Sequence, residues 1–105
     1  MRMMLKVTIP VDAGNTAIKN GQLSRTMQNT MERLKPEAAY FLADEGKRTA
    51  LFFFNMQDSA QIPPIAEPFF MGMNASLTIV PVMNAEDLQK GLAEAARASE
   101  EFPGR

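Results

Sequence analysis

The sequence predicts one α+β domain built on a four-stranded antiparallel sheet, and three observations lead to this fold class. The chain has 105 residues, a length at which one hydrophobic core is the usual arrangement. Patterns of apolar residues follow one another in the order strand, helix, strand, strand, helix, strand, and a third helix ends the chain. Neither a linker nor an internal repeat interrupts this order, so we expect a single domain over residues 1–105.

The first strand and the first helix are predicted from a change in the period of the apolar residues. Apolar and mixed side chains alternate over residues 3–11, which is typical of a strand with one buried face. A turn over residues 12–15 follows, and a helix with an apolar stripe then ends before Pro36. Because Gly21 interrupts this stripe, we expect residues 15–20 to form a separate first turn or an irregular loop before the main helix.

The next two strands are predicted as a β-hairpin. Two apolar segments, residues 38–43 and 49–56, flank a short polar link that contains Gly46. Both segments are apolar at odd and at even positions, whereas a sheet with one face in water carries polar residues at alternate positions. We therefore expect both faces of these strands to be covered.

The second half of the chain predicts a helix and an edge strand. Residues 59–73 carry a wide apolar stripe at helical spacing. Pro68 lies inside this segment and is expected to kink or split the helix, because proline lacks the backbone donor. The last strand, residues 76–83, contains Pro81, which predicts a position at the edge of the sheet.

The final segment predicts an amphipathic helix. Asn84 can cap this helix, and Asp87 follows three residues later, as in a capping box. The helix is expected to fray by Phe102, where the segment Phe102-Pro103-Gly104 begins. Its apolar face consists of Leu88, Leu92, Ala95 and Ala96.

The order of these elements corresponds to the ferredoxin-like, or split βαβ, arrangement. Right-handed crossovers place both main helices on one face of the sheet, with the first and third strands central and the second and fourth at the edges. The second face then needs a cover of its own. Either the C-terminal helix folds under the sheet, or a second copy presents its sheet and the two enclose a barrel-like interior. We favour the second copy.

The composition excludes several kinds of chemistry. The chain contains no His, no Cys and no Trp, so it offers neither imidazole nor thiolate ligands for a metal. Eleven basic and twelve acidic residues give a net charge of −1, which supplies no overall attraction for nucleic acid or anionic lipid. With no apolar run long enough for a membrane span and no signal-peptide pattern, we expect a cytoplasmic protein without a cofactor or a metal.

The strand and helix order, with strands that are apolar on both faces, resembles the dimeric α+β barrel superfamily. That superfamily includes antibiotic-biosynthesis monooxygenases, muconolactone isomerase and stress-responsive barrel proteins. The resemblance implies this fold and a homodimer but no particular activity. Haem-binding relatives use His, and the haem-degrading ones also use Trp, so the composition departs from both groups. More narrowly, small bacterial proteins of unknown role are similar in the segments 36–41, 46–49, 65–70, 74–75 and 81–83.

Lys6 and Tyr40 are the first two candidates for chemistry. Lys6 and Thr8 share the mixed face of the first strand and point into a dimer interior if their apolar neighbours pack on the helices. A lysine there acts as a base or an anion anchor, although a lysine near a strand end also reaches solvent through its flexible stem. Tyr40 can donate a hydrogen bond to a carbonyl or enolate oxygen. The alternative is a core tyrosine with a backbone partner.

Glu67 is the third catalytic candidate, and five further residues are candidates for ligand binding. The helical spacing places Glu67 off the apolar stripe, unless the irregularity at Pro68 turns it inward beside Asn74. A carboxylate held beside aromatic rings can act as a general base, whereas an exposed one is a surface residue. The aromatic candidates are equally explained as plain core. The expected ligand-binding residues are Thr8, Phe53, Phe69, Phe70 and Asn74.

Two hypotheses on function remain. The first is a cytoplasmic homodimer that binds a small apolar or aromatic molecule between sheet and helices, with cofactor-free chemistry of the monooxygenase or isomerase kind. In that case Tyr40, Lys6 or Glu67 polarises the substrate or transfers a proton. The second is a non-catalytic, stress-associated or interaction dimer whose interior is filled by side chains.

Overall fold

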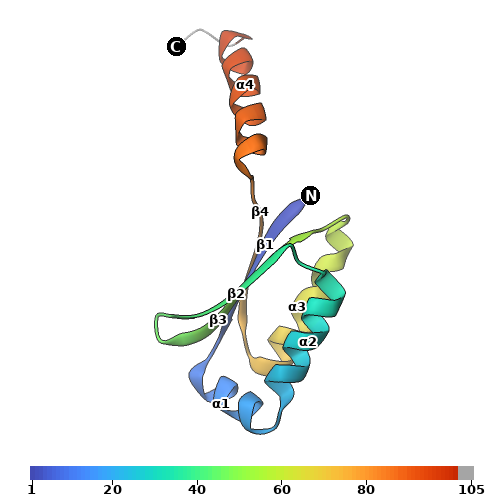
Figure 1. Cartoon of the computed structure of the whole chain (residues 1–105), viewed down its shortest axis with the longest axis vertical. Helices are drawn as coiled ribbons and strands as arrows, with labels where there is room; N and C mark the ends of the chain where they lie inside the picture. Colours follow the sequence, from blue (N-terminus) through green and yellow to red (C-terminus); the bar gives the residue numbers. More distant parts are fainter. Residues whose placement is uncertain (102–105) are drawn as a thin grey trace.

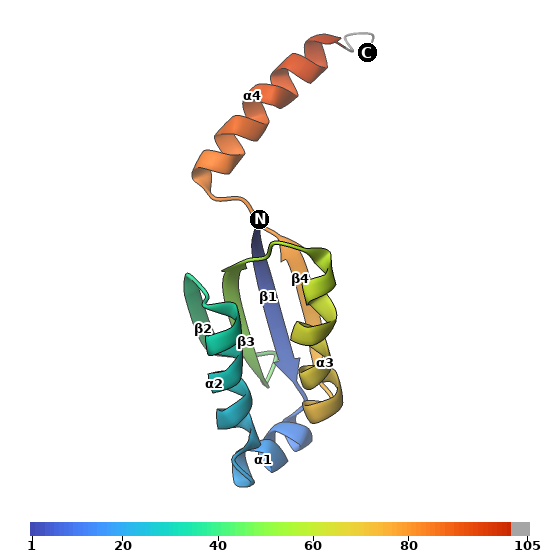
Figure 2. The ribbon, with the colours of Figure 1, turned by 90° about the vertical axis from the view of Figure 1, so that its right-hand side faces the viewer.

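The computed structural model describes residues 1–101 of the chain. Helices cover one face of a four-stranded antiparallel sheet, and a further helix extends from one end of that sheet (Figures 1 and 2). The strands β1 (Arg2–Ile9) and β3 (Lys47–Asn55) lie in the centre, as predicted, with β2 (Ala38–Asp44) and β4 (Ser76–Pro81) at the edges. This α+β arrangement is compatible with a ferredoxin-like fold.

The number of helices exceeds that of a plain βαββαβ unit. The α-helices are α1 (Val11–Lys19), α2 (Gln22–Leu34), α3 (Ile62–Met73) and α4 (Ala85–Glu101), and a short 3₁₀ helix, η1 (Ser59–Gln61), leads into α3. The segment between β1 and β2 therefore holds two helices instead of one.

Residues 11–19 form a helix of their own, α1, so the turn predicted over residues 12–15 is wrong, whereas the separate first turn expected before the main helix is part of α1. Gly14, which suggested a turn, lies inside the helix, where the guanidinium of Arg48 packs against it. A Cβ atom at this position would lie 2.7 Å from Nη1 of Arg48, the far end of a flexible side chain, so a larger residue would displace this guanidinium. The break between α1 and α2 falls at Gly21, whose φ of 77° a glycine adopts at little cost.

Helix α3 is continuous through Pro68, so the expected split is wrong. Buried side chains hold the helix to the sheet on both sides of this proline, with Ile65 and Ala66 before it and Phe69 and Met73 after it. Their burial stabilises the helix by roughly 1.5–3 kcal/mol for each large side chain, which offsets the missing backbone hydrogen bond.

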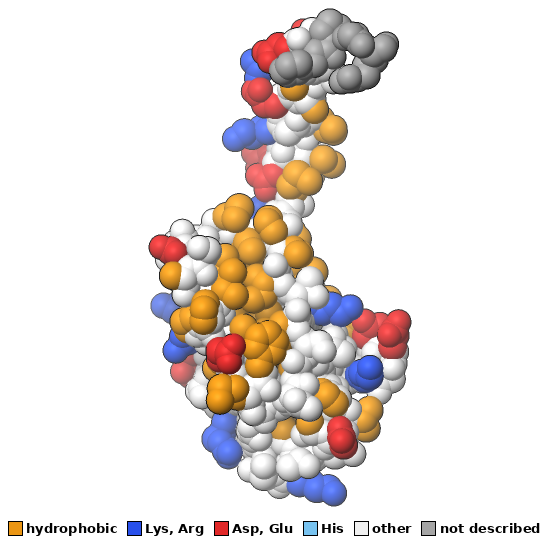
Figure 3. All heavy atoms as spheres, turned by 180° about the vertical axis from the view of Figure 1, so that it is seen from behind, with side chains coloured by type: hydrophobic (Ala, Val, Ile, Leu, Met, Phe, Trp, Pro, Cys, Tyr) orange, Lys and Arg blue, Asp and Glu red, His pale blue; other side chains and the backbone are white. Residues whose placement is uncertain are grey.

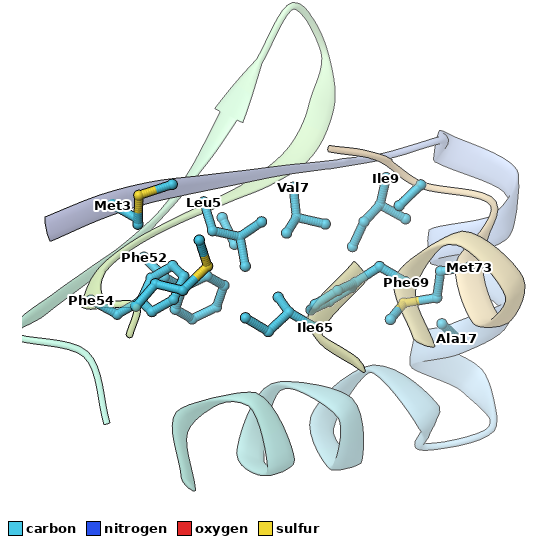
Figure 4. Close-up of a cluster of buried hydrophobic side chains, with 13 residues drawn as sticks. Met3, Leu5, Val7, Ile9, Ala17, Phe52, Phe54, Ile65, Phe69 and Met73 are labelled. Atoms are coloured by element: carbon cyan, nitrogen blue, oxygen red, sulfur yellow. The ribbon is translucent and has the colours of Figure 1, made fainter. Parts of the chain in front are cut away.

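The hydrophobic core fills the space between the sheet and the helices (Figure 4). Alternate residues of β1 point into it, and they meet side chains from β3 and α3. Leu5, Val7 and Phe52 are 0% exposed. These side chains fill the part of this layer that lies between β1, β3 and α3.

The hairpin between β2 and β3 turns over two residues, Glu45 and Gly46. Both have positive φ, 52° and 75°, which is the backbone that a type I′ turn requires. The turn brings Asp44 opposite Lys47 and sets the pairing of the two strands. The predicted hairpin is confirmed, with a link shorter than the sequence suggested.

Helix α4 begins as predicted but lies elsewhere than under the sheet. The backbone N–H of Asp87 donates to Asn84 at 2.8 Å, and the N–H of Asn84 donates to Asp87 at 3.1 Å, which forms a capping box. The helix extends beyond the end of the sheet, and every one of its residues is exposed. It therefore does not cover its own sheet. The predicted fraying at Phe102 lies outside the described residues.

Candidate functional site

The face of the sheet opposite the helices, here named the open face, is covered by no other element of residues 1–101 (Figures 1 and 2). Because side chains alternate along a strand, the residues that flank the buried positions of β1 and β3 point to this face. The strand register supplies the rest. The open face consists of Arg2, Met4, Lys6, Thr8, Ala38, Tyr40, Leu42, Asp44, Lys47, Thr49, Leu51, Phe53, Asn55, Ser76, Thr78 and Val80.

The open face has an apolar end and a polar end. At the end from which α4 extends, one row across the four strands is entirely apolar and comprises Ala38, Phe53, Met4 and Val80. In the opposite direction the residues of β1 and β4 become polar, with Lys6 beside Thr78 and Thr8 beside Ser76. The surface can therefore hold an apolar body at one end and a polar group at the other.

An ion pair between Lys6 and Asp44 crosses the polar end. The Nζ of Lys6 lies 2.9 Å from Oδ2 of Asp44. By register, Thr49 lies on β3 between the two strands that carry them, and it is only 4% exposed. Both charged side chains remain more than a third exposed, so this pair contributes at most about 1 kcal/mol to stability while the face is wet.

Tyr40 stands on the edge strand β2, in the row that contains Lys6. Its ring meets the ring of Phe53 edge to face, with centroids 6.4 Å apart and planes at 72°. Such a contact fixes the orientation of the ring. The residue is 60% exposed. This position excludes the alternative of a core tyrosine and leaves the side chain accessible from the open face.

The structure brings four of the eight predicted site residues to the open face and leaves four elsewhere. The first group is Lys6, Thr8, Tyr40 and Phe53. The second belongs to the helix side of the sheet: Phe69 is buried in the core, and Glu67, Phe70 and Asn74 are exposed on α3 or at its end. Glu67 is exposed, as its place off the apolar stripe predicted, and it shares no site with Lys6 and Tyr40.

Arg2 is a residue that the sequence did not single out. It lies at the apolar end of the open face, where Nε is 2.6 Å from Oε1 of Glu37 and Nη1 is 3.1 Å from Oδ2 of Asp87. Hydrogen bonding to Glu37 is the main reason why the pKa of Arg2 is raised, so the guanidinium stays charged. The alternation of β1 could have placed Arg2 on the face of Lys6, but its partners depend on the folded chain.

A separate apolar groove lies on the helix side, beside β2. It has a volume of about 490 Å³ and is lined by Ile18, Leu23, Met27 and Phe41, among others. Phe41 is 61% exposed here although it follows Tyr40 directly. The two aromatic residues point to opposite sides of the same strand, so the groove and the open face are different surfaces.

Comparisons with models of protein families, with curated proteins and with solved structures gave no match. Within residues 1–101, no three His, Cys, Asp or Glu side chains are grouped in a way that could hold a metal ion. In the same part of the chain, no helix has both the length and the apolar composition that crossing a bilayer requires.

Proposed function

We propose that the protein is a homodimer that binds a small, mainly apolar molecule with an anionic or carbonyl oxygen between two open faces. The observation that carries the proposal is the ion-paired Lys6 together with Tyr40 on a sheet face that the described chain leaves uncovered. The resemblance to dimeric α+β barrels supports the same arrangement. We also expect a cytoplasmic location, as the composition predicts.

A second copy is the partner that fits the open face best. The face exposes Tyr40, Leu42 and Val80 to water, and apolar surfaces of this kind usually mark interfaces. A second copy presents the same apolar end and can meet it about a two-fold axis, so both surfaces are covered at once. Two sheets packed face to face lie about 10 Å apart, which leaves room for a flat ligand where side chains are small.

The polar end of this interior supplies the chemistry. The ammonium of Lys6 attracts a negatively charged oxygen, and the hydroxyl of Tyr40, on the other side of Leu51 in the same row, can donate a hydrogen bond to a second polar atom of the ligand. Once a second copy excludes water, both interactions become stronger because the local dielectric constant falls. Such a site stabilises an enolate or phenolate, as cofactor-free isomerase or monooxygenase chemistry requires. Glu67 has no part in it, because it lies on the other side of the sheet.

Native mass spectrometry of gently purified protein tests the proposal. We expect a mass of twice the 11.6 kDa of one chain, with added mass where a ligand is retained. Binding of anilinonaphthalene sulfonate, an aromatic anion, then serves as a probe of the interior. Replacing Lys6 by Met should weaken its binding about tenfold, because a charged hydrogen bond is lost.

The variant Lys19→Met is the matched control, because this exposed lysine lies on α1, at the helix side. It removes the same charge and should leave probe binding unchanged. A monomeric mass overturns the proposal. A dimer that binds the probe equally in both variants, or not at all, instead supports the non-catalytic dimer with a filled interior.

A further inference from the structure

Helix α4 has an apolar face that no other element of residues 1–101 covers. Leu88 and Leu92 are 45% and 59% exposed. They belong to a set that recurs at alternating intervals of three and four residues, the spacing with which helices pair. The set is Ala85, Leu88, Leu92, Ala95 and Ser99.

The charges of α4 are confined to its other side. The positions that flank the apolar set are uncharged and mostly small, namely Gln89, Gly91, Ala96 and Ala98. The charged side chains lie opposite, and Figure 3 shows them on one side of the helix with the hydrophobic side chains on the other. No charge therefore hinders close approach of a second helix along this face.

Hydrogen bonds connect the start of α4 to β1. The N–H of Val82 donates to the carbonyl of Arg2 at 3.1 Å, which ties the chain to β1 beyond the end of β4. Oδ2 of Asp87 accepts from the N–H of Asn84 and from Nη1 of Arg2, both at 3.1 Å. The same carboxylate thus caps the helix and binds it to the sheet.

The apolar face of α4 and the open face look to the same side of the molecule. In Figure 1, α2 and α3 lie to the right of the strands, so the open face looks to the left. Figure 3 reverses this view, and there the hydrophobic side chains of α4 lie on the right, the side of the open face. The apolar row with Met4, Phe53 and Val80 lies at the end next to α4, and the ion-paired Arg2 lies between this row and the first turn of the helix.

We infer that β1 of one copy points in the same direction as β1 of the other copy, and that the two α4 helices pair side by side. This inference rests on the proposed dimer. It adds the relative orientation of the two copies and a second contact between them, the α4 pair. Copies aligned in this way match apolar end with apolar end, whereas copies that pointed opposite ways would set Lys6 and Asp44 against the apolar row. The spacing agrees as well, because packed sheets lie about 10 Å apart and packed helices 8–10 Å.

Cysteine cross-linking tests this pairing in the full chain, which has no cysteine of its own. In the dimer, residue 92 of one copy should lie beside residue 92 of the other, so Leu92→Cys should form a disulfide-linked dimer under mild oxidation. The control is Ala93→Cys, whose side chain points to the charged side of the same helix. It should remain largely unlinked.

The outcomes separate this inference from the proposed function. A native dimer in which Leu92→Cys fails to link, or links no better than Ala93→Cys, overturns the helix pairing and leaves the proposed dimer intact. So does a disulfide between Leu92→Cys in one copy and Val80→Cys in another, because α4 would then lie on the partner's sheet. A monomer overturns both. Leu88→Cys, one turn earlier, repeats the test in a second variant.

Discussion

Phe52 and Phe53 are neighbours with the same side chain, and they mark the two faces of the sheet. Phe52 points to the helices and is 0% exposed, whereas Phe53 points to the open face and is half-buried, with Tyr40 at its edge. The same side chain therefore stabilises the fold of one chain at Phe52, whereas at Phe53 it is exposed and can contact a partner. The difference comes from what covers each face, which the strand itself does not determine.

The two faces of β2 and β3, strands that are apolar at both parities, are also covered unequally. On the helix side, β1 and β3 meet α3 and form a closed core. On the other side, the described chain supplies no cover, since α4 leaves the sheet at its end. The core therefore does not account for Met4, Leu51 and Phe53, the apolar residues of β1 and β3 that lie on the open face.

Truncating each of the two phenylalanines should give the largest difference in unfolding free energy between the two faces. Phe52→Ala should lower the free energy of unfolding by about 3–5 kcal/mol, because it leaves a cavity in a packed core. Phe53→Ala removes the same atoms but should cost only about 1 kcal/mol at low protein concentration, where the single chain is measured. Chemical denaturation monitored by circular dichroism measures both values.

Protein concentration provides the control for this pair. If a dimer forms, raising the concentration should stabilise the unmodified chain by mass action. Phe53→Ala should reduce that gain, whereas Phe52→Ala should not alter it at concentrations where it remains folded. Equal costs for the two truncations, at every concentration, would show that the open face is no different from the core face.

A charge on the open face should break the dimer while sparing the fold. Val80→Asp places a carboxylate in the apolar row, next to Met4, and a second copy would have to bury it without a partner. We expect the dissociation constant of the dimer to rise about a hundredfold, or about 2.7 kcal/mol. Sedimentation velocity measures this change.

The matched control is Met71→Asp, because Met71 is exposed on α3, at the helix side. It adds the same charge and should leave the dimer intact. If both variants weaken the dimer equally, net charge rather than the open face governs association, and the comparison between the faces fails.

Much of the fold could be predicted from the sequence because local patterns report local structure. Alternation identified β1, and Pro81 identified β4 as an edge strand, as the strand order confirms. Helix α1 was missed because Gly14 and Asn15 are typical of turns, and only the folded chain shows Arg48 packed against that glycine. The sequence alone does not distinguish a glycine that lies inside a helix against another side chain from a glycine in a turn.

The candidate site was less predictable, because it depends on register and layers. Lys6 and Thr8 were placed on one face by alternation alone, and this is confirmed. Asp44 forms an ion pair with Lys6 because the two-residue turn sets the register of β2 against β3. Glu67 was expected off the apolar stripe of its helix, and it is exposed on α3, on the side of the sheet opposite Lys6. Which charged residues of different elements meet depends on the folded chain, as the partners of Lys6 and Arg2 show.

The smallest expected effect concerns the ion pair at the polar end, and it tells whether the open face becomes dry in the dimer. A double-mutant cycle with Lys6→Met and Asp44→Asn measures the coupling between the two charges. In the Val80→Asp background, where the face is wet, we expect a coupling of about 0.5 kcal/mol that fades with added salt. In the dimer, exclusion of water should raise the coupling about two- to threefold and reduce its dependence on salt. An equal coupling in both states would mean that Lys6 stays in water, and the polar end would then be no place to bind an anionic oxygen.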